Sequence, residues 1–143
     1  MATDSVDVSN YQLPITTNNH MLQVSNLNVY YGESHILRDV DLSVNVGQMV
    51  CLIGRNGVGK TTMLKTLMGL LQPRSGTISF GGESIVSKLT HQRAKMGIGY
   101  VPQGREIIPQ LTVKENLLLG LEAKPTKTKN PEVSGEIFEL FPV

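Results

Sequence analysis

The residues best suited to chemistry lie together in one glycine-rich stretch, residues 54–62, which reads GRNGVGKTT. It fits G-x-x-x-x-G-K-[ST], the pattern of a phosphate-binding loop (P-loop). Its glycines let the backbone turn tightly and aim successive N–H groups at phosphates. Lys60 supplies a full charge for the β- and γ-phosphates, and the Thr61 hydroxyl is placed to ligate Mg²⁺. The predicted nucleotide-binding residues here are Gly54, Arg55, Asn56, Gly57, Val58, Gly59, Lys60, Thr61 and Thr62.

The segments on both sides of this stretch come in the order that a P-loop requires. Residues 48–53 (QMVCLI) form a short apolar run, which is typical of a buried strand. Residues 63–71 have the apolar spacing of a helix. The predicted apolar face consists of Leu64, Leu67, Met68 and Leu71. Strand, glycine loop and helix in this order favour a nucleotide site over a glycine-rich turn that binds nothing.

Composition and charge limit the class of protein. The chain has 143 residues, 40% of them hydrophobic, and a formal net charge of +1, which predicts a soluble domain and no nucleic-acid partner. The single cysteine, Cys51, lies in the predicted strand and is expected to be a buried packing residue. One cysteine cannot form a disulfide within the chain, which fits a cytosolic location. Residues 1–20, rich in Ser, Thr, Asn and Asp, are predicted to be a disordered leader.

Two stretches before the P-loop alternate between apolar and polar residues. The first, residues 21–30, alternates with one slip, which indicates a strand with a bulge. Residues 31–34 (YGES) predict a turn, and residues 36–46 alternate again. The expected structure is an antiparallel hairpin within residues 22–46 that packs over the nucleotide-binding core.

The segments after the P-loop helix alternate between predicted strands and helices. A short strand is expected at 77–80, a charged helix at 90–96 and a second strand at 98–101, parallel to the P-loop strand. Thr112 and Glu115 have the spacing of a capping box before a helix. The last predicted helix spans residues 131–141. The fold class is therefore α/β, a P-loop core with a parallel sheet plus the N-terminal antiparallel β hairpin.

The motifs, taken in order, resemble the ATP-binding subunits of ABC transporters. Tyr31 precedes the P-loop where this family has an aromatic residue that stacks on adenine. Residues 69–78 (GLLQPRSGTI) resemble the link between its P-loop helix and the next strand, and residues 100–103 (YVPQ) resemble its Q-loop. The resemblance implies that residues 21–143 are the N-terminal part of an ABC-type nucleotide-binding domain, with ATP and Mg²⁺ as its ligands.

The resemblance also implies roles for individual residues. Tyr31 would stack on adenine, with Tyr30 as its rival. Gln103 would reach Mg²⁺ or the attacking water, and would act with Lys60 in catalysis. The metal ligands are thus Thr61, from the P-loop pattern, and Gln103, as the resemblance implies. His20, His35 and His91 show no metal-ligand spacing, and we expect no metal role for them.

Residues 101–109 (VPQGREIIP) look most similar to importers of urea and of branched-chain amino acids, and urea is the favoured substrate. The family implies membrane-spanning permease subunits and a second ATP-binding subunit as partners. The chain would lie in the cytoplasm, on the inner face of the membrane. Ile107 and Ile108 sit in a predicted loop, where an apolar pair is expected to meet a membrane-embedded partner.

The sequence also departs from the family. It contains no Leu-Ser-Gly-Gly signature, no apolar strand ending in Asp-Glu (the Walker B strand) and no later switch histidine. Two interpretations stay open at this point. The chain is either the front half of an ATPase subunit that powers import, or a truncated module that binds nucleotide without hydrolysing it.

Overall fold

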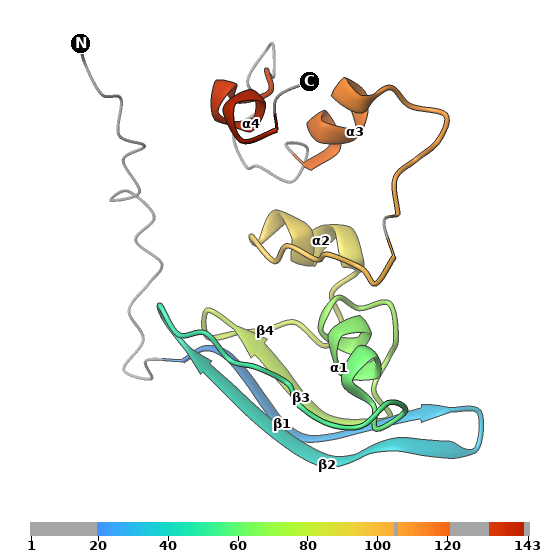
Figure 1. The fold of residues 1–143 in the computed structure, drawn as a ribbon. Helices are drawn as coiled ribbons and strands as arrows, with labels where there is room; N and C mark the ends of the chain where they lie inside the picture. Colours follow the sequence, from blue (N-terminus) through green and yellow to red (C-terminus); the bar gives the residue numbers. More distant parts are fainter. Residues whose placement is uncertain (1–19, 105, 121–131, 142–143) are drawn as a thin grey trace. The chain divides into compact units, whose positions relative to one another are not determined.

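The computed structural model describes residues 20–104, 106–120 and 132–141 (Figure 1). In chain order its elements are β1 (His20–Tyr31), β2 (Ser34–Asn45), α1 (Lys60–Leu67), β3 (Ser75–Phe80), β4 (Glu83–Ser84), α2 (Thr90–Lys95), α3 (Val113–Leu119) and α4 (Gly135–Leu140). The chain divides into two compact units, residues 1–88 and 89–143. Each unit is described by itself.

The first unit is built on an antiparallel sheet with strand order β2-β1-β3-β4. The hairpin predicted within residues 22–46 is confirmed as β1 and β2, which pair from His20↔Asn45 to Tyr31↔Ser34. His20, assigned to the leader from the sequence, is already the first residue of β1. Residues 1–19 of the predicted leader lie outside the described residues.

The slip in the alternation of β1 is a bulge, with a matching irregularity in β2. Asn26 (φ 50°) and Asp39 (φ 45°) both adopt left-handed backbone conformations, which Asn and Asp tolerate better than most residues. The Asn28 side chain links the two strands there, because its Nδ2 donates to Asp39 Oδ1 at 2.8 Å and its Oδ1 accepts from the Asp39 N–H at 3.1 Å. The extra residue keeps Val24 and Leu27 buried although they are three positions apart.

Helix α1 lies over one face of this sheet (Figure 1). The buried apolar side chains of the unit are Val24, Leu27, Val29, Leu37, Met63, Met68, Ile78 and Ile85. The predicted apolar face of the helix was partly wrong, because Leu64 is 42% exposed whereas Met63 and Thr66 are buried. The hydroxyl of Thr66 donates to the Thr62 carbonyl at 2.8 Å, so a polar side chain can face the core at little cost.

The two predicted parallel strands are absent from the described residues. Residues 48–53 and 98–101 have no strand conformation, and Met49 and Ile53 are 95% and 89% exposed. Cys51 is exposed too, so the prediction of a buried cysteine was wrong. A strand forms only where a neighbour accepts its backbone hydrogen bonds, and no described segment pairs with either run.

The second unit contains α2, α3 and α4. The capping box of α3 is confirmed: Glu115 Oε2 accepts from the Thr112 N–H at 2.8 Å, and Thr112 Oγ1 accepts from the Glu115 N–H at 3.3 Å. Helix α4 begins at Gly135 after Ser134, later than the predicted start at residue 131, which lies outside the described residues. No described helix is long and apolar enough to cross a membrane.

Candidate nucleotide-binding site

The P-loop runs from Gly54 to the start of α1, and its last glycine is fixed by contact with the hairpin. Gly59 is the N-cap of α1 and has φ 102°, a left-handed value that favours glycine. A Cβ at this position would lie 2.6 Å from Leu37 Cδ2 of β2. Gly59 is therefore favoured by its backbone conformation, and a side chain there would also displace the buried Leu37 methyl group.

The Lys60 side chain curls back into the loop that precedes it. Its Nζ donates to the carbonyl oxygen of Gly54 at 2.6 Å and to that of Arg55 at 2.7 Å. An ammonium group has three N–H donors, so one remains for a further acceptor. The contacts thus hold a full positive charge at the loop that the sequence predicted to bind phosphate.

The N-terminus of α1 adds to this charge. No acidic residue lies in its first turn and no side chain caps it, so the partial positive charge of the helix end is not neutralised locally. Thr61 is exposed there, whereas Thr62 is 7% exposed and packs toward the core. Thr61 is therefore the hydroxyl that a ligand outside the loop can reach.

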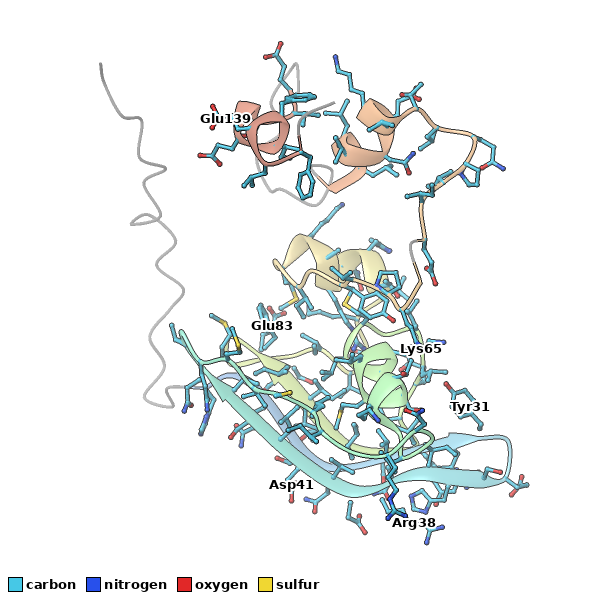
Figure 2. All side chains as sticks on the ribbon, viewed as in Figure 1. Tyr31, Arg38, Asp41, Lys65, Glu83 and Glu139 are labelled. Atoms are coloured by element: carbon cyan, nitrogen blue, oxygen red, sulfur yellow. The ribbon has the colours of Figure 1, made fainter. Side chains whose placement is uncertain are left out.

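The charge distribution of the sequence also indicates this site, although the motifs do not reveal it. No Asp or Glu occurs between Asp41 and Glu83, while the same interval contains Arg55, Lys60, Lys65 and Arg74. Figure 2 shows Lys65 on α1, and Asp41 on the opposite side of the sheet. A stretch with bases and no acids raises the local concentration of anions, as a polyphosphate site requires.

Two neighbouring tyrosines at the hairpin turn have different surroundings. The Tyr30 ring stacks on His35 with centroids 4.0 Å apart and planes at 10°, and the Arg74 guanidinium carbon lies 4.4 Å from its centroid. Both groups cannot occupy the same face at these distances, so both faces of Tyr30 are covered. Tyr31 is 46% exposed, and it projects from the side of the sheet on which α1 lies (Figure 2).

Gln103 is exposed in the loop between α2 and α3, next to Gly104 with φ 86°. It belongs to the second unit, whereas the P-loop and Tyr31 belong to the first. Ile107 and Ile108 are 69% and 43% exposed, in agreement with the predicted apolar pair on a loop. Arg105 lies outside the described residues.

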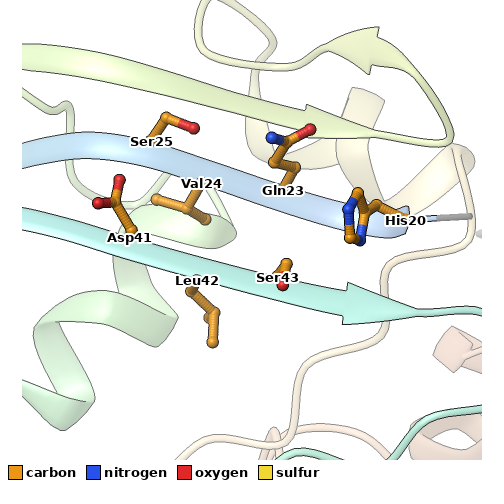
Figure 3. A pocket seen from close by; sticks show the side chains of 7 residues that line it. All are labelled: His20, Gln23, Val24, Ser25, Asp41, Leu42 and Ser43. Atoms are coloured by element: carbon orange, nitrogen blue, oxygen red, sulfur yellow. The ribbon is translucent and has the colours of Figure 1, made fainter. Parts of the chain in front are cut away.

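A hollow of about 360 Å³ lies on the hairpin at the end away from the turn (Figure 3). Its lining residues are His20, Gln23, Val24, Ser25, Asp41, Leu42 and Ser43. No Lys or Arg lines it, and the Asp41 carboxylate would repel phosphate, so it does not suit a nucleotide. Within the described ranges no three His, Cys, Asp or Glu side chains are grouped so as to hold a metal ion.

Comparison with known proteins places these features in a family. The sequence matches the family profile described as ABC transporter over residues 37–140. The high-affinity branched-chain amino acid transport ATP-binding protein BraG of Pseudomonas aeruginosa is 42% identical over 100 residues, which cover 70% of this chain and 43% of BraG. The lipopolysaccharide export system ATP-binding protein LptB of Haemophilus influenzae is 39% identical over 123 residues, covering 85% of this chain and 51% of LptB.

Solved structures agree with these sequence matches. An ATP-binding subunit of an ABC transporter is similar with a TM-score of 0.65 and 32% identity, over 84% of this chain and 46% of that one. A dimeric ATP-binding cassette bound to ADP and phosphate gives a TM-score of 0.65 and 30% identity, over 82% and 52% of the two chains. The chain thus spans about half the length of the relatives that it matches. The predicted α/β P-loop fold class is confirmed, and the chain belongs to the ABC transporter family.

Proposed function

We propose that this chain binds Mg·ATP through the P-loop and is the nucleotide-binding front part of an ATPase subunit of a membrane transporter. The observation that carries the proposal is the Lys60 ammonium, bound to the carbonyls of Gly54 and Arg55 at the uncapped start of α1. Backbone N–H groups, a helix N-terminus and one ammonium are the donors that a triphosphate needs. The acid-free interval between Asp41 and Glu83 supports the same ligand.

We propose a magnesium ion as the companion of the triphosphate. Thr61 offers an exposed hydroxyl beside Lys60, and Gln103 offers an exposed amide oxygen on its loop. Oxygen ligands from one or two side chains plus phosphate are what Mg²⁺ usually takes in nucleotide sites. When bound, the ion neutralises charge on the β- and γ-phosphates; Thr61 and Gln103 would hold it.

Tyr31 is the residue that we assign to the adenine base. Its ring is exposed, whereas Tyr30 is covered by His35 and Arg74 on its two faces. An aromatic ring stacks on any flat base through dispersion and its quadrupole, without reading the base edges. The covered ring therefore serves packing and the open ring serves base binding.

Hydrolysis needs more than these residues supply. In P-loop enzymes an acidic residue helps to hold Mg²⁺ and another group orients the attacking water. No Asp-Glu strand and no Leu-Ser-Gly-Gly signature occur in these 143 residues. We therefore assign nucleotide binding to this chain, with Lys60 and Gln103 as its catalytic contribution to a subunit that also carries those motifs. The second candidate is a module that binds ATP without hydrolysing it. A coding sequence that continues past codon 143 into both motifs favours the first, and a stop codon favours the second.

The transported solute and the partners belong to the whole subunit. Relatives at 42% identity are named as branched-chain amino acid transport proteins, which supports a small-solute importer, although LptB is named for lipopolysaccharide export. From the expected resemblance of residues 101–109 to urea importers we propose urea as the solute, with a branched-chain amino acid as the alternative. Permease subunits and a second ATP-binding subunit are the proposed partners, on the cytoplasmic face of the membrane. The exposed Ile107 and Ile108 are the proposed contact with the permease.

Calorimetric titration of the chain with Mg·ATP tests the nucleotide site. Lys60→Ala removes one charge-assisted contact, so affinity should fall by about ten- to a hundred-fold, or about 1.5–3 kcal/mol. Lys65→Ala is the matched control, because Lys65 is on the same helix but beyond the loop, and its effect should be below about threefold. Equal affinity of wild type and Lys60→Ala in folded samples would rule out the P-loop assignment.

A further inference from the structure

Asn116, in the second turn of α3, binds backbone groups on the segment that precedes the helix. Its Oδ1 accepts from the Ile108 N–H at 2.9 Å. Its Nδ2 lies 3.1 Å from the Ile108 carbonyl oxygen, 3.1 Å from that of Leu111 and 3.0 Å from that of Thr112. The Ile108 N–H can only donate and the three carbonyl oxygens can only accept, so the contacts fix which end of the Asn116 amide faces which group.

The Asn116 amide binds both the N–H and the C=O of Ile108. In a β-sheet, a neighbouring strand binds both backbone groups of a residue in the same way. The Leu111 N–H also donates to the Ile108 carbonyl at 3.1 Å, which closes a turn. The capping box of Thr112 and Glu115 follows directly. These hydrogen bonds therefore connect Ile108, the turn that follows it and the start of α3.

The segment upstream of Ile108 is different. Residues 99–104, 106 and 107 make no backbone–backbone hydrogen bond with another described residue. Gln103 lies within this segment, and among the described residues the first one after it that hydrogen-bonds to α3 is Ile108. The position of Gln103 relative to α3 therefore depends on the Asn116 anchor.

We propose that Asn116 is a positioning residue for the Gln103 loop, which it fastens to α3 without touching any ligand. The proposal rests on the proposed function, in which Gln103 reaches Mg²⁺ or the attacking water. Only the backbone of Ile108 is bound, so its side chain stays 43% exposed beside Ile107. Asn116 thus sets the direction of both the glutamine and the exposed isoleucines.

The residue type matters for this role. Aspartate would keep an acceptor for the Ile108 N–H but would place a negative charge against three carbonyl oxygens. Alanine would remove every bond. Lys114 offers a matched control on the same helix, because its side chain is exposed.

Hydrogen exchange on the full 143-residue chain tests the anchor itself. In Asn116→Ala the amides of Ile108 and Leu111 should exchange at least tenfold faster than in wild type, while those of α3 change little. Asn116→Asp keeps the acceptor for the Ile108 N–H, so exchange at Ile108 should rise less than in Asn116→Ala, and Lys114→Ala should match wild type. Unchanged exchange at Ile108 in Asn116→Ala would overturn the proposal, and so would equal loss of protection throughout α3, which would show a merely structural role.

The consequence for the nucleotide is tested by the Mg²⁺ dependence of ATP binding, measured as the ratio of Kd in EDTA to Kd in Mg²⁺. Gln103→Ala and Asn116→Ala should each lower this ratio by about tenfold with the Kd in EDTA unchanged, and the double variant should lower it no further. A lowered ratio in Gln103→Ala alone would overturn the role of Asn116. An unchanged ratio in Gln103→Ala would overturn the proposed role of Gln103 and, with it, the positioning that serves it.

Discussion

Two apolar runs precede the P-loop helix, and they end in opposite environments. In β1, Leu27 and Val29 are 0% exposed, whereas Met49 and Ile53 in the run that leads into the P-loop are 95% and 89% exposed. The difference lies in their neighbours: β1 pairs with β2 on one side and with β3 on the other, and no described strand pairs with residues 48–53. Burial of an apolar run is therefore decided by its partners.

The two sides of the P-loop differ in the same way. The P-loop is shaped from the hairpin side, where β2 approaches Gly59 so closely that a Cβ would lie 2.6 Å from Leu37 Cδ2. On its other side the preceding run has no described strand beside it. The hairpin therefore contacts the last glycine of the P-loop, whereas no described strand pairs with the run that precedes the loop.

The largest expected effect comes from truncating one side chain in each run. Leu27→Ala leaves a cavity in the core and should lower the free energy of unfolding of the first unit by about 2–5 kcal/mol. Met49→Ala removes an exposed side chain and should change it by less than about 0.5 kcal/mol. Urea titration of both variants measures the difference. Similar losses for both would mean that the run at 48–53 is packed like β1.

A similar contrast between a covered and an exposed side chain is found in two adjacent tyrosines at the hairpin turn, Tyr30 and Tyr31. Tyr31→Ala should weaken ATP binding by about 1–3 kcal/mol, the range for stacking of a base on an aromatic ring, and leave inorganic triphosphate binding unchanged. Tyr30→Ala should lower thermal stability, because the contacts with His35 and Arg74 are lost, but not the preference for ATP over triphosphate. The reverse pattern would exchange the roles that we assign to the two rings.

The smallest expected effect concerns the start of α3. Hydrogen bonds from the backbone and the side chain of Thr112 lower the pKa of Glu115 below its ordinary value. The charged carboxylate is therefore favoured in the folded state. Its contribution to stability is present above the ordinary glutamate pKa and is lost as the pH falls through the lowered one.

Helix protection at α3, followed by hydrogen exchange corrected for intrinsic pH effects, should accordingly decline on acidification in wild type. Glu115→Gln keeps a side-chain acceptor but cannot titrate, and should remove this decline. Identical acid profiles for wild type and Glu115→Gln would show that the capping box does not depend on the carboxylate charge.

The features that the sequence could predict are those decided by nearby residues. The hairpin followed from alternation, and its bulge from one slip that Asn26 and Asn28 explain. The capping box followed from the spacing of Thr112 and Glu115. The P-loop followed from glycines at fixed spacing before a lysine, although the bonds from Lys60 to two loop carbonyls are visible only in three dimensions.

The features that could not be predicted depend on distant contacts. Residues 48–53 have the composition of a buried strand, but a strand needs a partner that composition does not reveal. The choice between Tyr30 and Tyr31 depends on Arg74, more than forty positions away, which covers one face of Tyr30. The four contacts of Asn116 likewise leave no periodic signal in the sequence.

Thiol labelling of Cys51 tests the central contrast most directly, because this single cysteine lies in the unpaired run and no mutation is needed. The chain is mixed with a colourless disulfide reagent, and the labelling rate is compared between native buffer and urea. We predict that the native chain is labelled within about tenfold of the rate of the unfolded chain, as expected for an exposed thiol. Labelling in native buffer that is slower by several orders of magnitude and limited by unfolding would show a buried, paired strand and contradict the account.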